Sequence, residues 1–196
     1  MSSALILVRH SLPELDPHTP ASQWRLGDEG RRLCDLLAAR LAGRTPAVIA
    51  SSPEPKALET AMLVVKPLAW RSPSIQILDD LCEHKRDNVP WLSQEEFDAR
   101  LIEFFARPDQ RVLGDETAAE AQRRFTRAIA PSIARQADGD TLVFSHATVI
   151  TLFVTACTKE KPFEFWRKLG MPAFAVLTLP DLDLLHVESH AGVTQG

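Results

Sequence analysis

Three short aliphatic runs restrict the fold more than any other feature of this sequence. They lie at 4–8, 47–50 and 141–144, and each is followed by small polar or ionisable residues and then by helical spacing of apolar residues. A continuous apolar run of four or five residues is typical of a strand buried on both faces. Strands that alternate with amphipathic helices predict an α/β fold: a three-layer α/β/α sandwich around a mostly parallel sheet.

Other segments fit the same architecture. Residues 75–77 could form a further strand, and the runs 173–179 and 182–187 meet at Pro180-Asp181, which predicts an antiparallel pair at the sheet edge. Residues 190–196 are expected to be a frayed tail. Helices are expected from Gly30 to Gly43, from near Pro55, after the capping-box signatures at Ser93 and Thr117, and over Val149–Cys157.

Length and composition limit the number of domains and the classes of partner. The chain has 196 residues, so residues 1–196 are expected to form a single domain. With 45% hydrophobic and 24% charged residues it resembles soluble globular proteins rather than disordered ones. The net charge of −4, without a block of Lys or Arg, argues against nucleic acid or an anionic membrane as a partner.

The cysteines and the N-terminal run bear on the compartment. Three separated cysteines without a Cys-x-x-Cys pair indicate neither a disulfide framework nor a zinc site. The run 4–8 is too short for the core of a signal peptide. Residues 141–158 lack charged side chains but contain too many Ser, Thr and His residues for a membrane span. We therefore expect a cytoplasmic protein.

The polar residues that end the three strands are the candidate site. They are Arg9-His10-Ser11, Ser51-Ser52 and Ser145-His146. Ligands of open α/β sheets bind outside the carboxyl ends of the strands, so these groups are expected to converge there. Each also precedes a loop or helix start, where free backbone N–H groups favour anions.

Two histidines beside an arginine suit a phosphoryl group. Imidazole titrates near neutrality and can act as nucleophile, acid or base, and cations neutralise the phosphoryl oxygens. Glu83 could protonate the leaving oxygen and then deprotonate the attacking water, and His84 could do the same. A metal site built from His10, His146 and Glu83 is a weaker alternative, because Arg9 would repel the ion. Motifs of P-loop enzymes, Rossmann enzymes and serine hydrolases are absent.

Four motifs, in order, resemble those of the histidine phosphatase superfamily, the phosphoglycerate mutase-like proteins. Residues 7–11 are similar to its Arg-His-Gly strand end, with Ser11 in place of glycine. Residues 51–61 resemble Ser-Ser-Pro-Leu-x-Arg-Ala-x-Gln/Glu-Thr-Ala, residues 114–124 the Gly-Glu-Ser helix start, and residues 144–147 the second histidine motif. The likeness covers nearly the whole chain.

The resemblance implies a role for each matched residue. His10 would be the phosphorylated nucleophile, with Arg9 and His146 holding phosphoryl oxygens and Glu83 as the acid. Ser11 and Ala147, which follow the two histidines, would contact substrate. Lys56 stands where the family has a second phosphate-binding arginine, and lysine keeps the charge but not the bidentate geometry. If Lys56 is instead an exposed residue of the first helical turn, it has no part in the site.

The expected function is hydrolysis of a small phosphomonoester through phosphohistidine, by a metal-independent acid-type histidine phosphatase with no cofactor. The alternatives are phosphoryl transfer of the phosphoglycerate mutase type, and a weakly active phosphate-binding or adaptor protein, suggested by Lys56. Trp91 and residues 97–105 could supply an apolar patch for a homo-oligomer. Residues 12–24 and 93–108 are expected to shape the substrate side, and the sequence does not identify the substrate.

Overall fold

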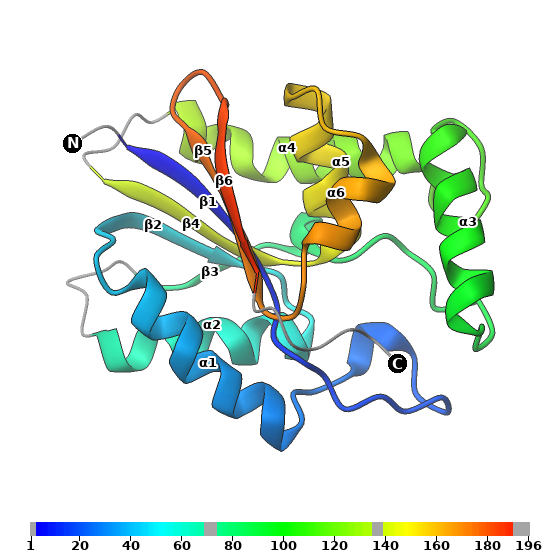
Figure 1. Ribbon diagram of the computed structural model, residues 1–196, viewed down its shortest axis with the longest axis horizontal. Coiled ribbons are helices and arrows are strands. Elements are labelled where there is room, and N and C mark those ends of the chain that lie inside the picture. The colour runs from blue at the N-terminus through cyan, green and yellow to red at the C-terminus, as the bar shows by residue number, and fades with distance from the viewer. Residues whose placement is uncertain (1–2, 69–73, 135–138, 190–196) are drawn as a thin grey trace.

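The computed structural model describes residues 3–68, 74–134 and 139–189, and within them six strands form one sheet. The strand order is β3-β2-β4-β1-β5-β6 (Figure 1). The strands are β1 (Ala4–Arg9), β2 (Pro46–Ser51), β3 (Gln76–Ile77), β4 (Asp140–Ser145), β5 (Ala173–Thr178) and β6 (Leu184–Ser189).

The sheet is mostly parallel, as the sequence predicted. The parallel pairs are β1 with β4, β4 with β2 and β2 with β3. The expected antiparallel hairpin of β5 and β6 lies at one edge, and β5 also pairs antiparallel with β1. The central strands β1 and β4 are buried along their whole length, which explains why they are continuous aliphatic runs.

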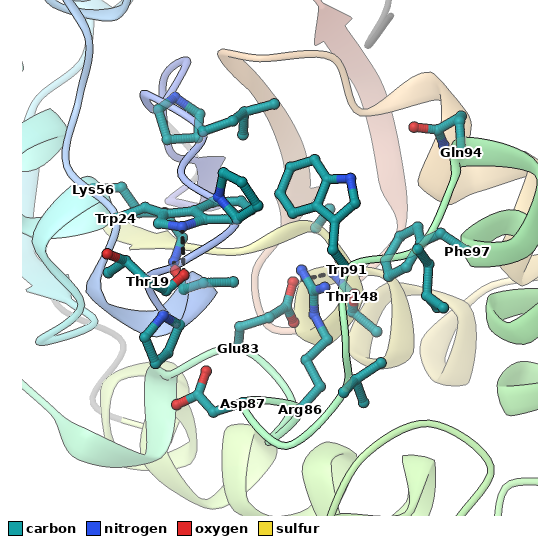
Figure 2. Close-up of a pocket in the computed structure, with 18 of the residues that line it drawn as sticks. Thr19, Trp24, Lys56, Glu83, Arg86, Asp87, Trp91, Gln94, Phe97 and Thr148 are labelled. Atoms are coloured by element: carbon teal, nitrogen blue, oxygen red, sulfur yellow. Dashed lines mark hydrogen bonds between the residues drawn. The ribbon is translucent and has the colours of Figure 1, made fainter.

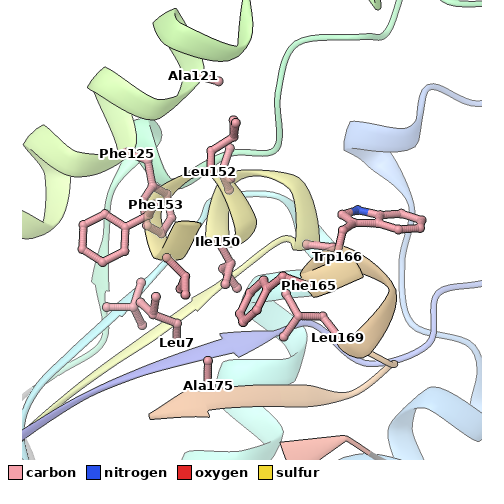
Figure 3. Packing of buried hydrophobic residues seen from close by; sticks show 14 of the residues in the cluster. Leu7, Ala121, Phe125, Ile150, Leu152, Phe153, Phe165, Trp166, Leu169 and Ala175 are labelled. Atoms are coloured by element: carbon pink, nitrogen blue, oxygen red, sulfur yellow. The ribbon is translucent and has the colours of Figure 1, made fainter. Parts of the chain in front are cut away.

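Helices cover both faces of the sheet (Figure 1). Alternate side chains of β1 point to opposite faces, so Ile6 packs with α1 and α2, and Leu7 packs with the other helices (Figure 3). The three-layer prediction is confirmed. The helices are α1 (Asp28–Leu41), α2 (Pro55–Leu68), α3 (Gln94–Ala106), α4 (Ala118–Ala134), α5 (Ala147–Cys157) and α6 (Pro162–Lys168), with short 3-10 turns η1 (Ala21–Gln23) and η2 (Asp79–Leu81).

The local helix signals were accurate, with three exceptions, one of which is that α5 begins at Ala147 instead of Val149. Both capping boxes form, at Ser93 with Glu96 and at Thr117 with Glu120. Helix α1 begins at Asp28 instead of Gly30, and a Cβ at Gly30 would overlap the Leu12 carbonyl oxygen. Helix α6 was not predicted. The expected tail at 190–196 lies outside the described residues, and no helix in the described part of the chain is long and apolar enough to cross a membrane.

Candidate active site

The three polar strand ends converge at the carboxyl edge of the sheet, as predicted. The backbone N–H of His10 donates to the Ser145 carbonyl at 3.0 Å, and that of Ser52 donates to the Phe144 carbonyl at 2.9 Å. A cavity of about 440 Å³ opens at this edge (Figure 2). Of the residues predicted for the site, the cavity is lined by Arg9, His10, Lys56, Glu83 and Ala147.

His10 has the geometry and protonation of a nucleophile. Its Nδ1 lies 2.7 Å from the Ser11 carbonyl oxygen. A carbonyl only accepts hydrogen bonds, so we assign the ring proton to Nδ1, which leaves Nε2 with a free lone pair. Burial, aided by the neighbouring His146, Lys56 and Arg9, holds the pKa of His10 well below its usual range. The ring is therefore neutral at pH 7.

His146 lies beside His10, with its ring centroid 5.2 Å away. It is fully buried and does not itself line the cavity, and its Nε2 lies 2.9 Å from Ser52 Oγ. Among the described residues its Nδ1 has no hydrogen-bond partner. Burial, and secondarily the charge of Lys56, holds the pKa of His146 well below its usual range, so this ring is also neutral before a ligand binds.

Arg9 is a buried guanidinium at the end of β1. Its Nη1 donates to the Leu169 carbonyl, and its Cζ lies 5.9 Å from the centroid of the Trp166 ring. Burial lowers the pKa of Arg9 to about 10, so the group stays charged at neutral pH. Arg9 therefore brings a fixed positive charge to the cavity beside His10.

Lys56 is part of the site and not an exposed residue of α2, but its charge is already paired. The residue is 4% exposed, and its Nζ donates to Glu54 Oε2 and, at 2.6 Å, to the Ala21 carbonyl. Glu54 occupies the position where the family motif has leucine. Burial raises the pKa of Glu54 in spite of Lys56, and its Oε1 lies 3.6 Å from His146 Nε2. The position where the family motif has arginine is therefore held by a lysine that is paired with a glutamate.

Glu83 lines the cavity, whereas His84 turns into the core. Glu83 accepts hydrogen bonds from the backbone N–H groups of His84 at 2.9 Å and Thr148 at 3.2 Å. Burial raises its pKa, but the His84 side chain, whose Nδ1 lies 3.7 Å from Glu83 Oε1, together with nearby His146 and Arg86, outweighs burial and holds the pKa of Glu83 well below its usual range. His84 packs on Phe104 with ring centroids 4.7 Å apart. Of the two candidate acids, the cavity exposes Glu83.

A buried arginine from α4 fixes the segment that carries Glu83. Arg124 binds Glu116 through both carboxylate oxygens at 2.7 and 2.8 Å. It also donates to the carbonyls of Asp80, Cys82 and Glu83, each at 2.8 Å. The segment from Asp80 to Glu83 has no regular structure beyond the short turn η2, so these bonds set the position of the carboxylate.

Ser11, which was expected to contact substrate, does not line the cavity. Its hydroxyl donates to the Gly30 carbonyl at 2.7 Å and its N–H donates to Thr60 Oγ1 at 2.9 Å, so it holds α1 and α2 against β1.

In the described residues, no three His, Cys, Asp or Glu side chains are placed to share a metal ion. The geometry gives no support to the alternative of a metal bound by His10, His146 and Glu83.

Sequence reasoning missed the partners that are distant along the chain. No local sequence pattern predicts the ion pair between Arg124 and Glu116. For Glu54, the only signal in the sequence is that it replaces the leucine of the family motif. The apolar spacing of Phe163, Trp166 and Leu169 could have predicted α6. That helix supplies Trp166 to the cavity wall and is followed by the carbonyl that binds Arg9.

The fold and the paired buried histidines define the class of protein: the chain belongs to the histidine phosphatase superfamily, whose family model matches residues 5–181. The matching model is that of branch 1, so this is a branch 1 member. No curated protein matches the chain.

Solved structures show the same fold at low sequence identity. A mycobacterial hydrolase superposes with a TM-score of 0.77 at 17% identity, covering 97% of this chain and 100% of its own. A mycobacterial glucosyl-3-phosphoglycerate phosphatase gives a TM-score of 0.72 at 18% identity, covering 91% of each chain. A phosphoserine phosphatase variant from Entamoeba histolytica, in complex with phosphoserine, gives a TM-score of 0.75 at 16% identity, covering 95% of this chain and 97% of its own. The phosphoglycerate mutase-like fold is therefore confirmed.

Proposed function

We propose that the protein is a phosphomonoesterase that works through a phosphohistidine on His10. The observation that carries this proposal is a neutral imidazole that lines the cavity, with Nδ1 bound to the Ser11 carbonyl and, among the described residues, no hydrogen bond at Nε2. Membership of the histidine phosphatase superfamily and the fold of two solved phosphatases support it.

In the first step, His10 Nε2 attacks phosphorus and the bond from phosphorus to the ester oxygen breaks. Arg9 binds phosphoryl oxygens, and the N-terminus of α5 at Ala147 adds backbone dipoles that favour an anion. The His146 ring does not line the cavity of the free protein, so its unpartnered Nδ1–H would join them only when the bound phosphoryl group reaches past His10 to this buried ring. A hydrogen bond from Ser52 Oγ to His146 Nε2 would place the ring proton of His146 on Nδ1 for this purpose. The result is phosphohistidine and free alcohol.

Glu83 supplies the proton that the departing alkoxide needs. Its pKa is low in the free protein, and a phosphoryl dianion beside it raises that pKa by like-charge repulsion. The proton enters with the substrate monoanion. In the second step Glu83 takes a proton from water, the water oxygen bonds to phosphorus, and the N–P bond breaks to regenerate His10. The cations of the protein supply the positive charge, so this proposed mechanism requires neither metal nor cofactor.

A phosphate-release assay on a panel of phosphomonoesters, with a metal chelator present, tests the proposal. We expect release that persists with chelator and disappears in His10→Ala. Release that requires an added metal ion, or that survives the loss of His10, would contradict it.

A weakly active phosphate-binding protein is the second candidate, favoured by the pairing of Lys56 with Glu54. In that case inorganic phosphate binds, and neither turnover nor phosphohistidine is observed.

A further inference from the structure

The cavity is much larger than a phosphoryl group, and much of its wall is aromatic. It encloses about 440 Å³, a size typical of sites that enclose a whole small molecule, and the candidate catalytic side chains are only part of its lining. The walls also include four aromatic residues, with proline and aliphatic side chains between. The four are Trp24, Trp91, Phe97 and Trp166.

These rings come from separate elements and form two contacting pairs. Trp24 and Trp91 have ring centroids 6.1 Å apart, and Phe97 and Trp166 have centroids 6.0 Å apart. In Figure 2 the indoles of Trp24 and Trp91 lie above Glu83, with Phe97 on the far side of Trp91. The proposed acid and the aromatic rings therefore line the same cavity.

The aromatic walls are partly fixed before any ligand binds. The Nε1 of Trp24 donates to the carbonyls of Asp16 at 3.1 Å and Thr19 at 3.0 Å, and Trp166 is buried. Trp91, by contrast, is 56% exposed at the rim. Rigid aromatic faces bind flat apolar groups at a small cost in conformational entropy, and covering Trp91 removes apolar surface from water.

Among the described residues that line the cavity, Arg86 is the one arginine or lysine besides Arg9 and Lys56 that could meet a second anionic group. Arg86 stacks on Phe97 with its Cζ 4.8 Å from the ring centroid, and Asp87 is a carboxylate bound to the Ser22 hydroxyl at 2.6 Å. His18 also lines the cavity. A carboxylate or second phosphate on the substrate would meet one guanidinium and the repulsion of Asp87 and Glu83.

We propose that the substrate is the phosphate monoester of an alcohol that carries an aromatic or similarly flat apolar group without a second negative charge. This inference rests on the proposed phosphatase function and adds the substrate class. Trp24, Trp91, Phe97 and Trp166 are the residues that determine specificity: they hold the apolar group while the phosphate lies on His10.

The test compares kcat/KM for 2-phenylethyl phosphate, ethyl phosphate and 3-phosphoglycerate. All three release a primary alcohol, so differences report binding of the group and not its ease of departure. We expect kcat/KM for the phenylethyl ester to exceed that of the other two at least tenfold, equivalent to about 1.4 kcal/mol, mainly through a lower KM. Trp91→Ala should reduce this preference at least fivefold. The control Leu185→Ala, an exposed site on β6, should not change it.

Equal values for the phenylethyl and ethyl esters, or a preference for 3-phosphoglycerate, would overturn the inference and leave the phosphatase proposal standing. Absence of release from every ester would instead contradict the phosphatase proposal. Calorimetry with 2-phenylethylphosphonate and ethylphosphonate then decides the inference independently of turnover. At least tenfold tighter binding of the aryl compound supports it, and equal binding overturns it.

Discussion

Replacing Lys56 with methionine should destabilise the protein, because Glu54 would become a buried carboxylate without its cation. Both side chains are almost inaccessible, with Glu54 7% and Lys56 5% exposed. Removing one partner of a buried ion pair costs about 3–5 kcal/mol. A chain of this length loses about 2–4 °C of Tm per kcal/mol, so Tm should fall by about 6–20 °C.

The loss of stability caused by Lys56→Met should be smaller at lower pH. Burial already raises the pKa of Glu54 above 4.5, and Lys56 lowers it in part. Without Lys56 the folded-state pKa rises further, so the folded state binds the proton more tightly than the unfolded state. The loss of stability of Lys56→Met relative to wild type is then largest at pH values above the folded-state pKa of Glu54, and it shrinks as the pH falls through that pKa. Melting curves at pH 8 and pH 5 should show a smaller difference from wild type at pH 5.

The double variant Glu54→Leu/Lys56→Met is the matched control. Replacing a buried pair by apolar residues of similar size is often neutral, so its Tm should stay within about 4 °C of wild type. In phosphate-release assays kcat/KM of Lys56→Met should be lower than that of wild type by a factor on the order of 10² to 10³, because the site keeps a carboxylate and loses a cation. The kcat/KM of the double variant should be at least tenfold higher than that of Lys56→Met.

Two outcomes would refute this reasoning. A Lys56→Met variant with wild-type Tm at both pH values would show that Glu54 does not depend on Lys56. A double variant that melts as low as the single one would show that packing, not charge, makes Lys56 necessary.

Two further predictions concern Glu83 and the arginine that fixes it. Glu83→Gln should slow hydrolysis of alkyl phosphates much more than that of activated aryl phosphates, which need little protonation to depart; equal losses in steady-state assays would exclude Glu83 as the acid. Arg124→Met should lower the free energy of unfolding, measured in urea, by about 3–5 kcal/mol because it leaves Glu116 unpaired. Arg127→Met, on the same helix but with a 72% exposed side chain, should lower it by less than about 1 kcal/mol. Similar losses for the two arginine variants would contradict a special role for Arg124.

The central sheet and the position of the site could be predicted from the sequence because their signals are local. Aliphatic runs such as 4–8 and 141–144 are long enough to mark buried strands. In parallel strands the residues that follow the carboxyl ends must meet at one edge. Arg9, His10 and His146 are therefore brought together by topology alone, although the two histidines lie 136 positions apart in the sequence.

The rest of the site depends on pairings that no local pattern shows. The sequence predicts that Lys56 supplies a cation, and only the structure shows that this cation forms an ion pair with Glu54. The rigidity of the Glu83 segment comes from Arg124, a residue on another element. Ser11 follows the proposed nucleophile His10 in sequence, yet its hydroxyl turns back to the Gly30 carbonyl because α1 passes close to Leu12 there.

Detection of a phosphate on His10 tests the central claim most directly. The protein is mixed briefly with a phosphomonoester, quenched at alkaline pH, where phosphohistidine survives, and analysed by peptide mass spectrometry. We predict one acid-sensitive phosphate on the peptide that contains His10, attached through Nε2, and none in His10→Ala. Phosphate on Ser11, Ser52 or His146, or turnover by His10→Ala at the wild-type rate, would contradict the account.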